Sequence, residues 1–373
     1  MPIVLPRMHA SQDLQYDYDC SSRPRSPAII LCQDCYPNSR YQMTLPMNML
    51  IQAKTLPPRD QEAVMSANHS NHSGSNPTVS IIIPCRNELG HLQSTVDSML
   101  AAGGLADTEI IVVDDGSEDG SAGFLTNPDS IYRDVKLIKT ENLGAARTRN
   151  LGADYAFGDI LVFCDAHIRV PPGWTDTLAS AMASPEVSAL CPAIASMDRP
   201  QDAGYGATWD SSLAFSWLPR PMGYGGGGHP VAVPIAPGGC LAVKREAFTH
   251  VGGFQHNFRV WGFDDQEFSM RLWLFGFEVY VHPDVQILHY FRPRHPYAVS
   301  YRHVDYNMLW MAFTHFNQER FAKTIALASA RAGYLEILAE VTMAEAAWEQ
   351  RRNYLTNRTH DDNWFMQRFG IPF

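Results

Sequence analysis

The sequence predicts an α/β fold in which helices flank a mixed, mainly parallel sheet. The first observation is that short β-branched runs alternate with stretches of helical period between residues 79 and 164. The second is that polar clusters follow these runs, at 85–88, 114–117 and 165–167. Alternating strands and helices are typical of βαβ units, and right-handed crossovers bring the carboxyl ends of parallel strands to one edge, where ligands bind.

The elements of this fold follow one another in chain order. Strands are expected where the β-branched runs lie, at residues 79–83, 109–113, 135–138, 159–164 and 240–243. Helices are expected where apolar residues recur at helical spacing, at residues 91–101, 142–155, 244–249 and 267–275. The sequence therefore predicts that residues 78–295 form the α/β domain.

The flanking regions differ from this core. Residues 1–77 are rich in Pro, Ser, Asn and Gln and show no sustained period, so we expect an irregular N-terminal extension and linker. Residues 196–237 resemble a loop, and the four glycines 225–228 predict a hinge or lid within it. Residues 301–316 and 321–352 predict two long amphipathic helices, so the C-terminal region 296–373 is expected to be helical.

Charge and composition exclude several classes of protein. The 373 residues contain 29 Lys and Arg against 39 Asp and Glu, a net charge of −10, which argues against nucleic-acid binding and against a polybasic membrane anchor. No apolar run reaches the roughly 18 residues that span a bilayer, so no integral membrane segment is expected. No secretory signal is apparent, and Cys85, Cys164, Cys191 and Cys240 lie in or beside apolar segments. We therefore expect a cytoplasmic protein with buried thiols.

Three groups of side chains could carry chemistry. Asp165 and His167 follow a buried strand two residues apart, so they could share a divalent ion or be chance neighbours in a turn. Asp264 and Asp265 open a predicted helix, where carboxylates either cap the helix or include a general base. His289 ends a further strand-like run and is either structural or a ligand.

A fourth group lies in the N-terminal extension. Cys32 and Cys35 have the CxxC spacing of zinc ligands, with Cys20 upstream and His69 and His72 downstream. A second CxxC pair is missing. An extension without metal is therefore favoured over a zinc site.

Taken together, the motifs between residues 79 and 292 resemble glycosyltransferase family 2, the nucleotide-sugar enzymes of the GT-A fold. Their order and spacing make the resemblance specific, whereas each motif alone is weak. The resemblance implies a GT-A, Rossmann-like domain. The motifs are VSIIIPCRNE (79–88), IIVVDDGSEDG (110–120), NLGAARTRNLGA (142–153), GDILVFCDAH (158–167), GGCLAVKREAFTHVGGF (238–254) and WGFDDQEFSMRLW (261–273).

The resemblance implies roles for individual residues at the nucleotide. Pro84, Arg86 and Glu88 would border the nucleoside pocket. Asp115 would hydrogen-bond the base, which is uracil in most relatives. Arg149 would lie near the nucleotide.

Further roles concern the sugar and the diphosphate. Gly239, with Gly238, would let the backbone approach the donor sugar, or would form a tight turn. Trp261 would lie near sugar and acceptor, or would close the core. Arg292, Arg294 and His295 would contact the diphosphate or form a solvated basic patch.

The metal motif departs from the usual pattern of the family. Asp165 and His167 form DxH in place of DxD, which is similar to the polypeptide N-acetylgalactosaminyltransferases. Those enzymes carry a later metal-ligating His in a His-x-Phe-Arg context, matched here by His289. The resemblance thus implies a site of Asp165, His167 and His289, which suits Mn²⁺ better than Mg²⁺ because imidazole prefers later metals.

The acidic loop bears on the stereochemistry. Retaining peptide transferases have Asn where Asp265 stands, whereas in inverting relatives an Asp there is the general base. We therefore expect Asp265 to take the acceptor proton in an inverting reaction, and Asp264 to bind the acceptor or support the loop.

The resulting hypothesis is a metal-dependent glycosyltransferase of the hexosyltransferase type. It would move a sugar from a nucleotide-sugar donor, with UDP as the expected nucleotide, to a soluble acceptor such as a peptide or a small natural product. The alternatives are a retaining transferase and an inactive nucleotide-sugar-binding scaffold. The C-terminal helices would cap one sheet face, or would expose aromatics near Trp310 and Phe313 as an acceptor platform or dimer interface. The oligomeric state is left open.

Overall fold

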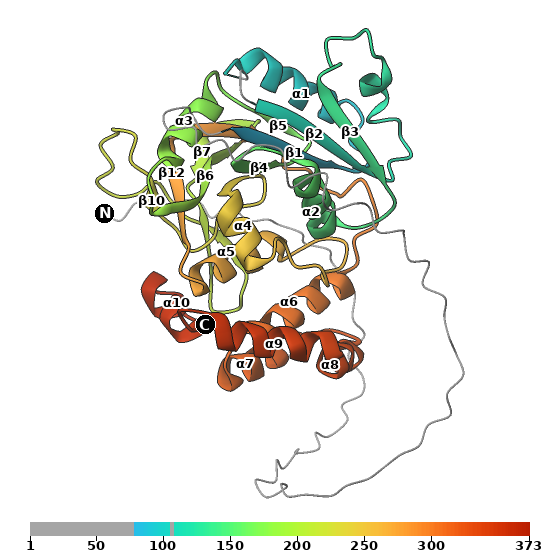
Figure 1. Cartoon of the computed structure of the whole chain (residues 1–373). Coiled ribbons are helices and arrows are strands. Elements are labelled where there is room, and N and C mark those ends of the chain that lie inside the picture. The colour runs from blue at the N-terminus through green and yellow to red at the C-terminus, as the bar shows by residue number, and fades with distance from the viewer. Residues whose placement is uncertain (1–77, 105–107) are drawn as a thin grey trace, which may run out of the picture. The chain divides into compact units, whose positions relative to one another are not determined.

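A computed structural model describes residues 78–104 and 108–373, which belong to one compact unit (Figure 1). Residues 1–77, including Cys32 and Cys35, lie outside the described residues. The strands are β1 (Val79–Cys85), β2 (Thr108–Asp115), β3 (Val135–Thr140), β4 (Ile160–Cys164), β5 (Ile168–Arg169), β6 (Val187–Ser196), β7 (Arg199–Gly204), β8 (Ala207–Trp209), β9 (Phe215–Trp217), β10 (Val231–Ala232), β11 (Cys240–Lys244) and β12 (Glu278–His289). The helices are α1 (His91–Ala102), η1 (Gly123–Thr126), α2 (Ala145–Tyr155), α3 (Trp174–Met182), α4 (Arg245–Val251), α5 (Asp264–Leu274), α6 (Tyr301–His315), α7 (Gln318–Ala328), α8 (Tyr334–Met343), α9 (Glu345–Asn357) and α10 (Asp362–Phe369).

The main sheet of the described residues has the strand order β10-β12-β6-β11-β4-β1-β2-β3. Strands β3, β2, β1 and β4 are parallel, and β11 runs antiparallel to both β4 and β6. Because β12 is parallel to β6, the strands β1, β2, β4, β6 and β12 all end at the same edge. This confirms the predicted mixed, mainly parallel sheet and brings the polar clusters that follow its strands together.

Helices cover both faces of the sheet. Helices α1 and α3 pack with one core cluster, and α2, α4 and α5 pack with the other, together with residues of the C-terminal helices (Figure 1). Three consecutive residues of β1, Ile81, Ile82 and Ile83, are completely buried. Such a run is expected for a central parallel strand whose two faces are both covered.

The expectation of a loop at 196–237 is wrong in part. This segment contains β7, which pairs with β6, the small β8–β9 sheet, and β10, which pairs with β12. These strands have two to six residues and mixed polarity, so their periodicity is too short to distinguish them from loops.

The C-terminal region is helical, as predicted, but the expected second long helix is wrong. The segment is divided among α7, α8 and α9, and Gly333 adopts a left-handed conformation with φ 77° before α8. Trp310 and Phe313 are only 1% and 5% exposed and belong to the core, which favours the helical cap over the alternative of an exposed aromatic platform. No helix among the described residues combines the length and apolar character needed to cross a bilayer.

A completely buried ionic network joins α5 to the C-terminal helices. Arg271 donates from Nε and Nη2 to the two oxygens of Glu267, each at 2.9 Å, and His315 Nε2 lies 2.8 Å from Glu267 Oε1. The His315 ring stacks on Tyr354 of α9 at 4.6 Å. Burial by itself raises the pKa of Glu267, but Arg271 and His315 outweigh it and lower this pKa to about 2. Glu267 and Arg271 therefore stay charged at working pH, and the contacts of Glu267 with His315 fix α5 against the C-terminal region.

Replacing Arg271 by Met should reduce the free energy of unfolding by about 3–5 kcal/mol, because it leaves a buried carboxylate without its main partner. Denaturant unfolding measures this loss. A matched control is Lys323→Met, whose side chain is 52% exposed and pairs with the exposed Glu319, and which should cost less than about 0.5 kcal/mol. Equal effects of the two variants would contradict a structural role for the network.

Candidate functional site

Three potential metal ligands meet at the carboxyl edge of the sheet. Asp165 directly follows β4, His167 lies two residues further on, and His289 is the last residue of β12. Their donor atoms all lie within 4.8 Å of one another. Asp165 Oδ2 is 3.2 Å from His289 Nε2 and 4.0 Å from His167 Nε2. The structure thus brings together the three residues that the sequence assigns to one ion.

The residues present fit a divalent ion of the later first row. One carboxylate and two imidazoles are a suitable donor set, and ligands of a shared ion lie about 3 Å apart when each is about 2.1 Å from it. Burial alone raises the pKa of Asp165, but the hydrogen bond from His289 and the charges of His167 and Arg149 hold this pKa well below its usual range. Burial lowers the pKa of His289, which leaves its ring neutral and able to ligate.

Glu88 connects this cluster to the segment after β12. Its Oε2 accepts a hydrogen bond from Arg292 Nη2 at 2.5 Å, and its Oε1 lies 3.4 Å from His167 Nδ1. Burial tends to raise the pKa of Glu88, but His167 and Arg292 lower it overall. Arg292 is therefore paired with Glu88 and does not form a solvated patch. Glu88, which is predicted to border the nucleoside, also lies beside the ring of His167.

Arg149 of α2 bridges the metal candidates and the acidic helix. Its Nη1 donates to Asp264 Oδ2, and its Nη2 lies 3.3 Å from Asp165 Oδ1. Burial by itself lowers the pKa of Arg149, but the carboxylates Asp264, Asp165 and Asp265 raise it. A permanent positive charge thus lies between the predicted ligand Asp165 and the predicted catalytic pair.

Asp265 lies in the first turn of α5 beside the Gly238 backbone. Its Oδ2 accepts from Gly238 N at 2.8 Å, and its Oδ1 accepts from Gln266 N at 2.8 Å. Burial, reinforced by the charge of Asp264, raises the pKa of Asp265 to about 7. A carboxylate with such a pKa is suited to accept a proton near neutral pH. Asp264 instead receives the Arg149 guanidinium and Gly262 N, so its contacts support the loop.

Gly239 provides close backbone approach at the metal cluster. A Cβ at Gly239 would lie 3.2 Å from the ring carbon Cδ2 of His289, and one at Gly238 would lie 3.3 Å from Asp265 Cβ. The carbonyl of Gly239 accepts from Asp165 N at 3.1 Å. Both glycines therefore border the predicted catalytic groups.

Aromatic contacts tie the segment after β12 to two neighbouring loops. Trp261 is 42% exposed, so it does not close the core, and its ring lies 4.6 Å from the ring of His295. The guanidinium of Arg86 lies 5.4 Å from the centroid of the Tyr297 ring. These contacts join the segment after His289 to the loops that follow β1 and precede α5.

The two remaining nucleotide candidates lie on the strands next to this edge. Asp115 ends β2, and its two oxygens accept from Leu143 N at 2.6 Å and Gly144 N at 2.9 Å. In this position it holds the turn that starts α2. Pro84 is the penultimate residue of β1 and pairs with Val113 of β2.

Sequence reasoning missed Asn307 of α6, which holds the loop before α5. Its Oδ1 accepts from Arg259 N at 2.8 Å, and its Nδ2 donates to Arg259 O at 2.9 Å and to Gly262 O at 2.8 Å. Val260 and Phe263 in this loop have φ values of 41° and 64°, a left-handed conformation that side chains disfavour. Asn307 lies in the distant C-terminal region, and no local pattern marks it.

The glycine-rich loop at residues 225–228, for which a hinge or lid is predicted, contacts β12 away from its carboxyl end. Gly228 N and the Tyr224 hydroxyl donate to Asp284 Oδ2 at 3.0 and 2.8 Å. Asp284 lies five residues before His289 on β12. The loop therefore covers a different part of the sheet from the metal candidates.

Comparisons with known proteins bear on the family and the fold. Residues 80–252 match the profile of glycosyl transferase family 2, and residues 232–296 match that of the N-terminal domain of galactosyltransferase. The chain is 32% identical over 249 residues to polypeptide N-acetylgalactosaminyltransferase 4 of Mus musculus, covering 61% of this chain and 42% of that protein. It is 30% identical over 237 residues to polypeptide N-acetylgalactosaminyltransferase 10 of Homo sapiens, covering 60% of this chain and 39% of that protein.

The chain thus spans about two fifths of the length of these curated relatives. A solved structure of GalNAc-T7 with UDP, GalNAc and Mn²⁺ superimposes with a TM-score of 0.65 at 19% identity, covering 80% of this chain and 57% of that one. That likeness concerns the fold. Residues 80–252 of this chain therefore match the model of glycosyl transferase family 2, and the chain has a GT-A-like fold.

Proposed function

We propose that this chain is a metal-dependent glycosyltransferase that moves a sugar from a UDP-sugar to a soluble acceptor with inversion at the anomeric carbon. The observation that carries the proposal is one connected site. Asp165, His167 and His289 converge there, and Arg149 joins them to the acidic pair that contains Asp265.

The chain's own residues supply the acid–base chemistry. Asp265, with its pKa near 7, takes the proton of the acceptor nucleophile as that atom bonds to the anomeric carbon. The bond between this carbon and the diphosphate oxygen breaks at the same time, and the electron pair leaves with the nucleoside diphosphate. Arg149 keeps Asp264 and Asp165 in place and is itself held by them.

The metal would act on the leaving group of this reaction, the nucleoside diphosphate. Asp165, His167 and His289 would hold Mn²⁺, in preference to Mg²⁺, and the ion would offset the charge that develops on the diphosphate. The UDP and Mn²⁺ of the similar GalNAc-T7 structure support both choices. Glu88 orients His167 and thereby the ligand set.

The proposals for the acceptor and the compartment rest on the names of the relatives and on the cysteines. The curated relatives are named polypeptide transferases, which favours a peptide acceptor. The described cysteines, Cys85, Cys164, Cys191 and Cys240, are buried free thiols, in keeping with the proposed cytoplasmic location.

The test is release of nucleoside diphosphate from a panel of UDP-, GDP- and dTDP-sugars with Mn²⁺. We expect one UDP-sugar to be turned over and the activity to disappear on chelation. NMR of the glycosylated product then gives the anomeric configuration. A product that keeps the donor configuration would favour the retaining alternative. If no donor in the panel releases nucleoside diphosphate and the chain binds no nucleotide, an inactive scaffold would be favoured and the proposal overturned.

A further inference from the structure

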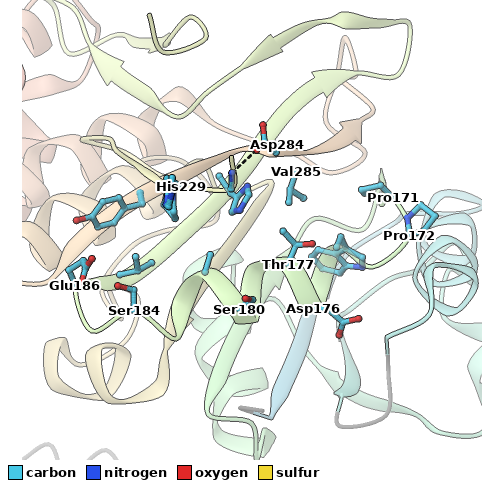
Figure 2. A pocket seen from close by; sticks show the side chains of 17 residues that line it. Pro171, Pro172, Asp176, Thr177, Ser180, Ser184, Glu186, His229, Asp284 and Val285 are labelled. Atoms are coloured by element: carbon cyan, nitrogen blue, oxygen red, sulfur yellow. Dashed lines mark hydrogen bonds between the residues drawn. The ribbon is translucent and has the colours of Figure 1, made fainter. Parts of the chain in front are cut away.

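A cavity of about 970 Å³ lies between α3, the beginning of β6, the first half of β12 and residues 228–230. Figure 2 shows Thr177 and Ser180 of α3 on one side, with His229 and Asp284 across from them. This volume is at the upper end of the range of small-ligand sites. None of the three metal candidates lines it.

The cavity is separate from the site described above. The lining residues of β12 extend from Tyr280 to Val285, whereas His289 is the last residue of that strand. An extended strand rises about 3.3 Å per residue, so the cavity lies further back along the sheet from its carboxyl edge. No role in the proposed transfer reaction has been assigned to its residues.

The charge of its walls disfavours an anionic ligand. The described lining includes the carboxylates of Asp176, Glu186 and Asp284, and among these lining residues there is no Lys or Arg. Asp284 holds the glycine-rich loop through Gly228 N and Tyr224, which leaves Asp176 and Glu186 at the wall. Lys244, whose charge acts on Glu186, donates its Nζ to the carbonyl of Ser184 at 2.8 Å.

Two buried nitrogens in the wall have no hydrogen-bond partner. Trp174 is 1% exposed and His282 is 2% exposed, and both line the cavity. The indole Nε1 of Trp174 and the Nδ1 of His282 are unpartnered. Buried polar groups are normally paired. The indole N–H of Trp174 requires an acceptor, and burial lowers the pKa of His282, so its neutral ring can accept a hydrogen bond from a donor.

We propose that this cavity binds a short peptide segment that carries a Lys or Arg side chain. The cationic head would pair with Asp176 and Glu186, and the peptide backbone, which has both a carbonyl and an N–H, would satisfy Trp174 and His282. A free alkylamine matches the carboxylates but offers no acceptor to Trp174. The inference rests on the proposed function only in taking this segment as part of the acceptor.

Calorimetry of the full chain without any donor tests the binding directly. The probes are acetyl-Gly-Arg-Gly-Arg-Gly-amide, its Gln and Glu counterparts, and spermidine. We expect the Arg peptide to bind one site per chain, and the Gln and Glu peptides to bind about 3- to 10-fold more weakly, as expected when two exposed carboxylates lose their cationic partner. Trp174→Phe should weaken the binding of the Arg peptide and leave the binding of spermidine unchanged.

Matched variants separate the cavity from general electrostatics. Asp176→Asn combined with Glu186→Gln should remove the preference for Arg over Gln. Asp134→Asn combined with Glu319→Gln, whose side chains are 90% and 80% exposed elsewhere, should retain it.

Equal binding of the Arg and Gln peptides, tighter binding of spermidine than of the Arg peptide, or equal losses in both pairs of variants would overturn the inference. So would the absence of binding at millimolar peptide. The calorimetry contains no donor and therefore tests peptide binding independently of turnover. If the protein turns over a UDP-sugar but does not bind the peptide, this inference alone is refuted. A protein that binds the peptide but no nucleotide would refute only the proposed function.

Discussion

Asp165→Asn should reduce metal-dependent release of nucleoside diphosphate by about 10²–10⁴-fold, because a bound metal contributes several kcal/mol to the stabilisation of the leaving group. The substitution removes the negatively charged ligand and leaves only the imidazoles of His167 and His289 beside the Arg149 charge. Electron paramagnetic resonance of Mn²⁺ measures the accompanying loss of bound ion. His289→Ala should act in the same direction.

Asp134→Asn is the control for this loss. Its carboxylate is 90% exposed and pairs only loosely with Arg133 at 3.7 Å. We expect its Mn²⁺ binding and its rate to match those of the unaltered chain. If Asp165→Asn bound Mn²⁺ with unchanged stoichiometry and kept its rate, the ion would have to be held elsewhere.

Asp265→Asn should lower the rate of transfer to the acceptor by about 10²–10⁴-fold, the usual contribution of a general base. The amide keeps the shape of the side chain but cannot take the acceptor proton. Donor binding, measured by calorimetry with the UDP-sugar, should change little. A variant that transfers sugar at the original rate would exclude Asp265 as the base and favour retention, since the retaining relatives have Asn at this place.

The pH profile gives a second readout of the same residue. Asp265 must be ionised to act as a base, and its pKa is about 7. The rate of transfer should therefore rise with pH and level off above about 7, whereas a carboxylate of ordinary pKa would give a flat profile from about pH 5 upwards. Removing the neighbouring charge by Asp264→Asn lowers the pKa of Asp265, so the rise should move to lower pH.

The sign of the stability effect is opposite to that on activity. A carboxyl whose pKa is raised in the folded state stabilises the fold below its unfolded pKa, and this contribution is lost as pH rises through the folded pKa. At pH 8 Asp265 is charged in a place that disfavours the charge. Asp265→Asn should therefore unfold at a higher temperature than the unaltered chain at pH 8, with a smaller difference at pH 5. Lower thermal stability would indicate that the activity loss reflects damage to the fold.

The local features of the site were predictable from residues close together in the sequence. The alternation of strands and helices predicts the sheet, and parallel strands with right-handed crossovers must end at one edge. Asp165 and His167 are therefore placed correctly by their position after β4. His289 was linked to them through the resemblance to a family, and the register of β12 with β6 brings it there.

The helical C-terminal region shows why boundaries are harder to predict. Apolar periodicity runs through residues 321–352, yet Gly333 separates α7 from α8. Trp310 and Phe313 lie on the buried side of α6. In the sequence, this side cannot be distinguished from an exposed aromatic face that binds a partner. Periodicity identifies an apolar face but does not say what covers it.

The fold class, the sheet edge that carries the candidate site and the types of side chain gathered there follow from the sequence alone. Which of these side chains touch one another depends on the tertiary structure. Four features join segments that are distant in the sequence. They are the contacts of Arg149 with Asp165 and Asp264, the Glu88–Arg292 pair, the hydrogen bonds of Asn307 to the loop before α5, and the cavity beside α3. The physical reason is that hydrogen bonds and ion pairs act over about 3 Å, and such distances between segments are set by how helices pack on the sheet, which no local pattern encodes.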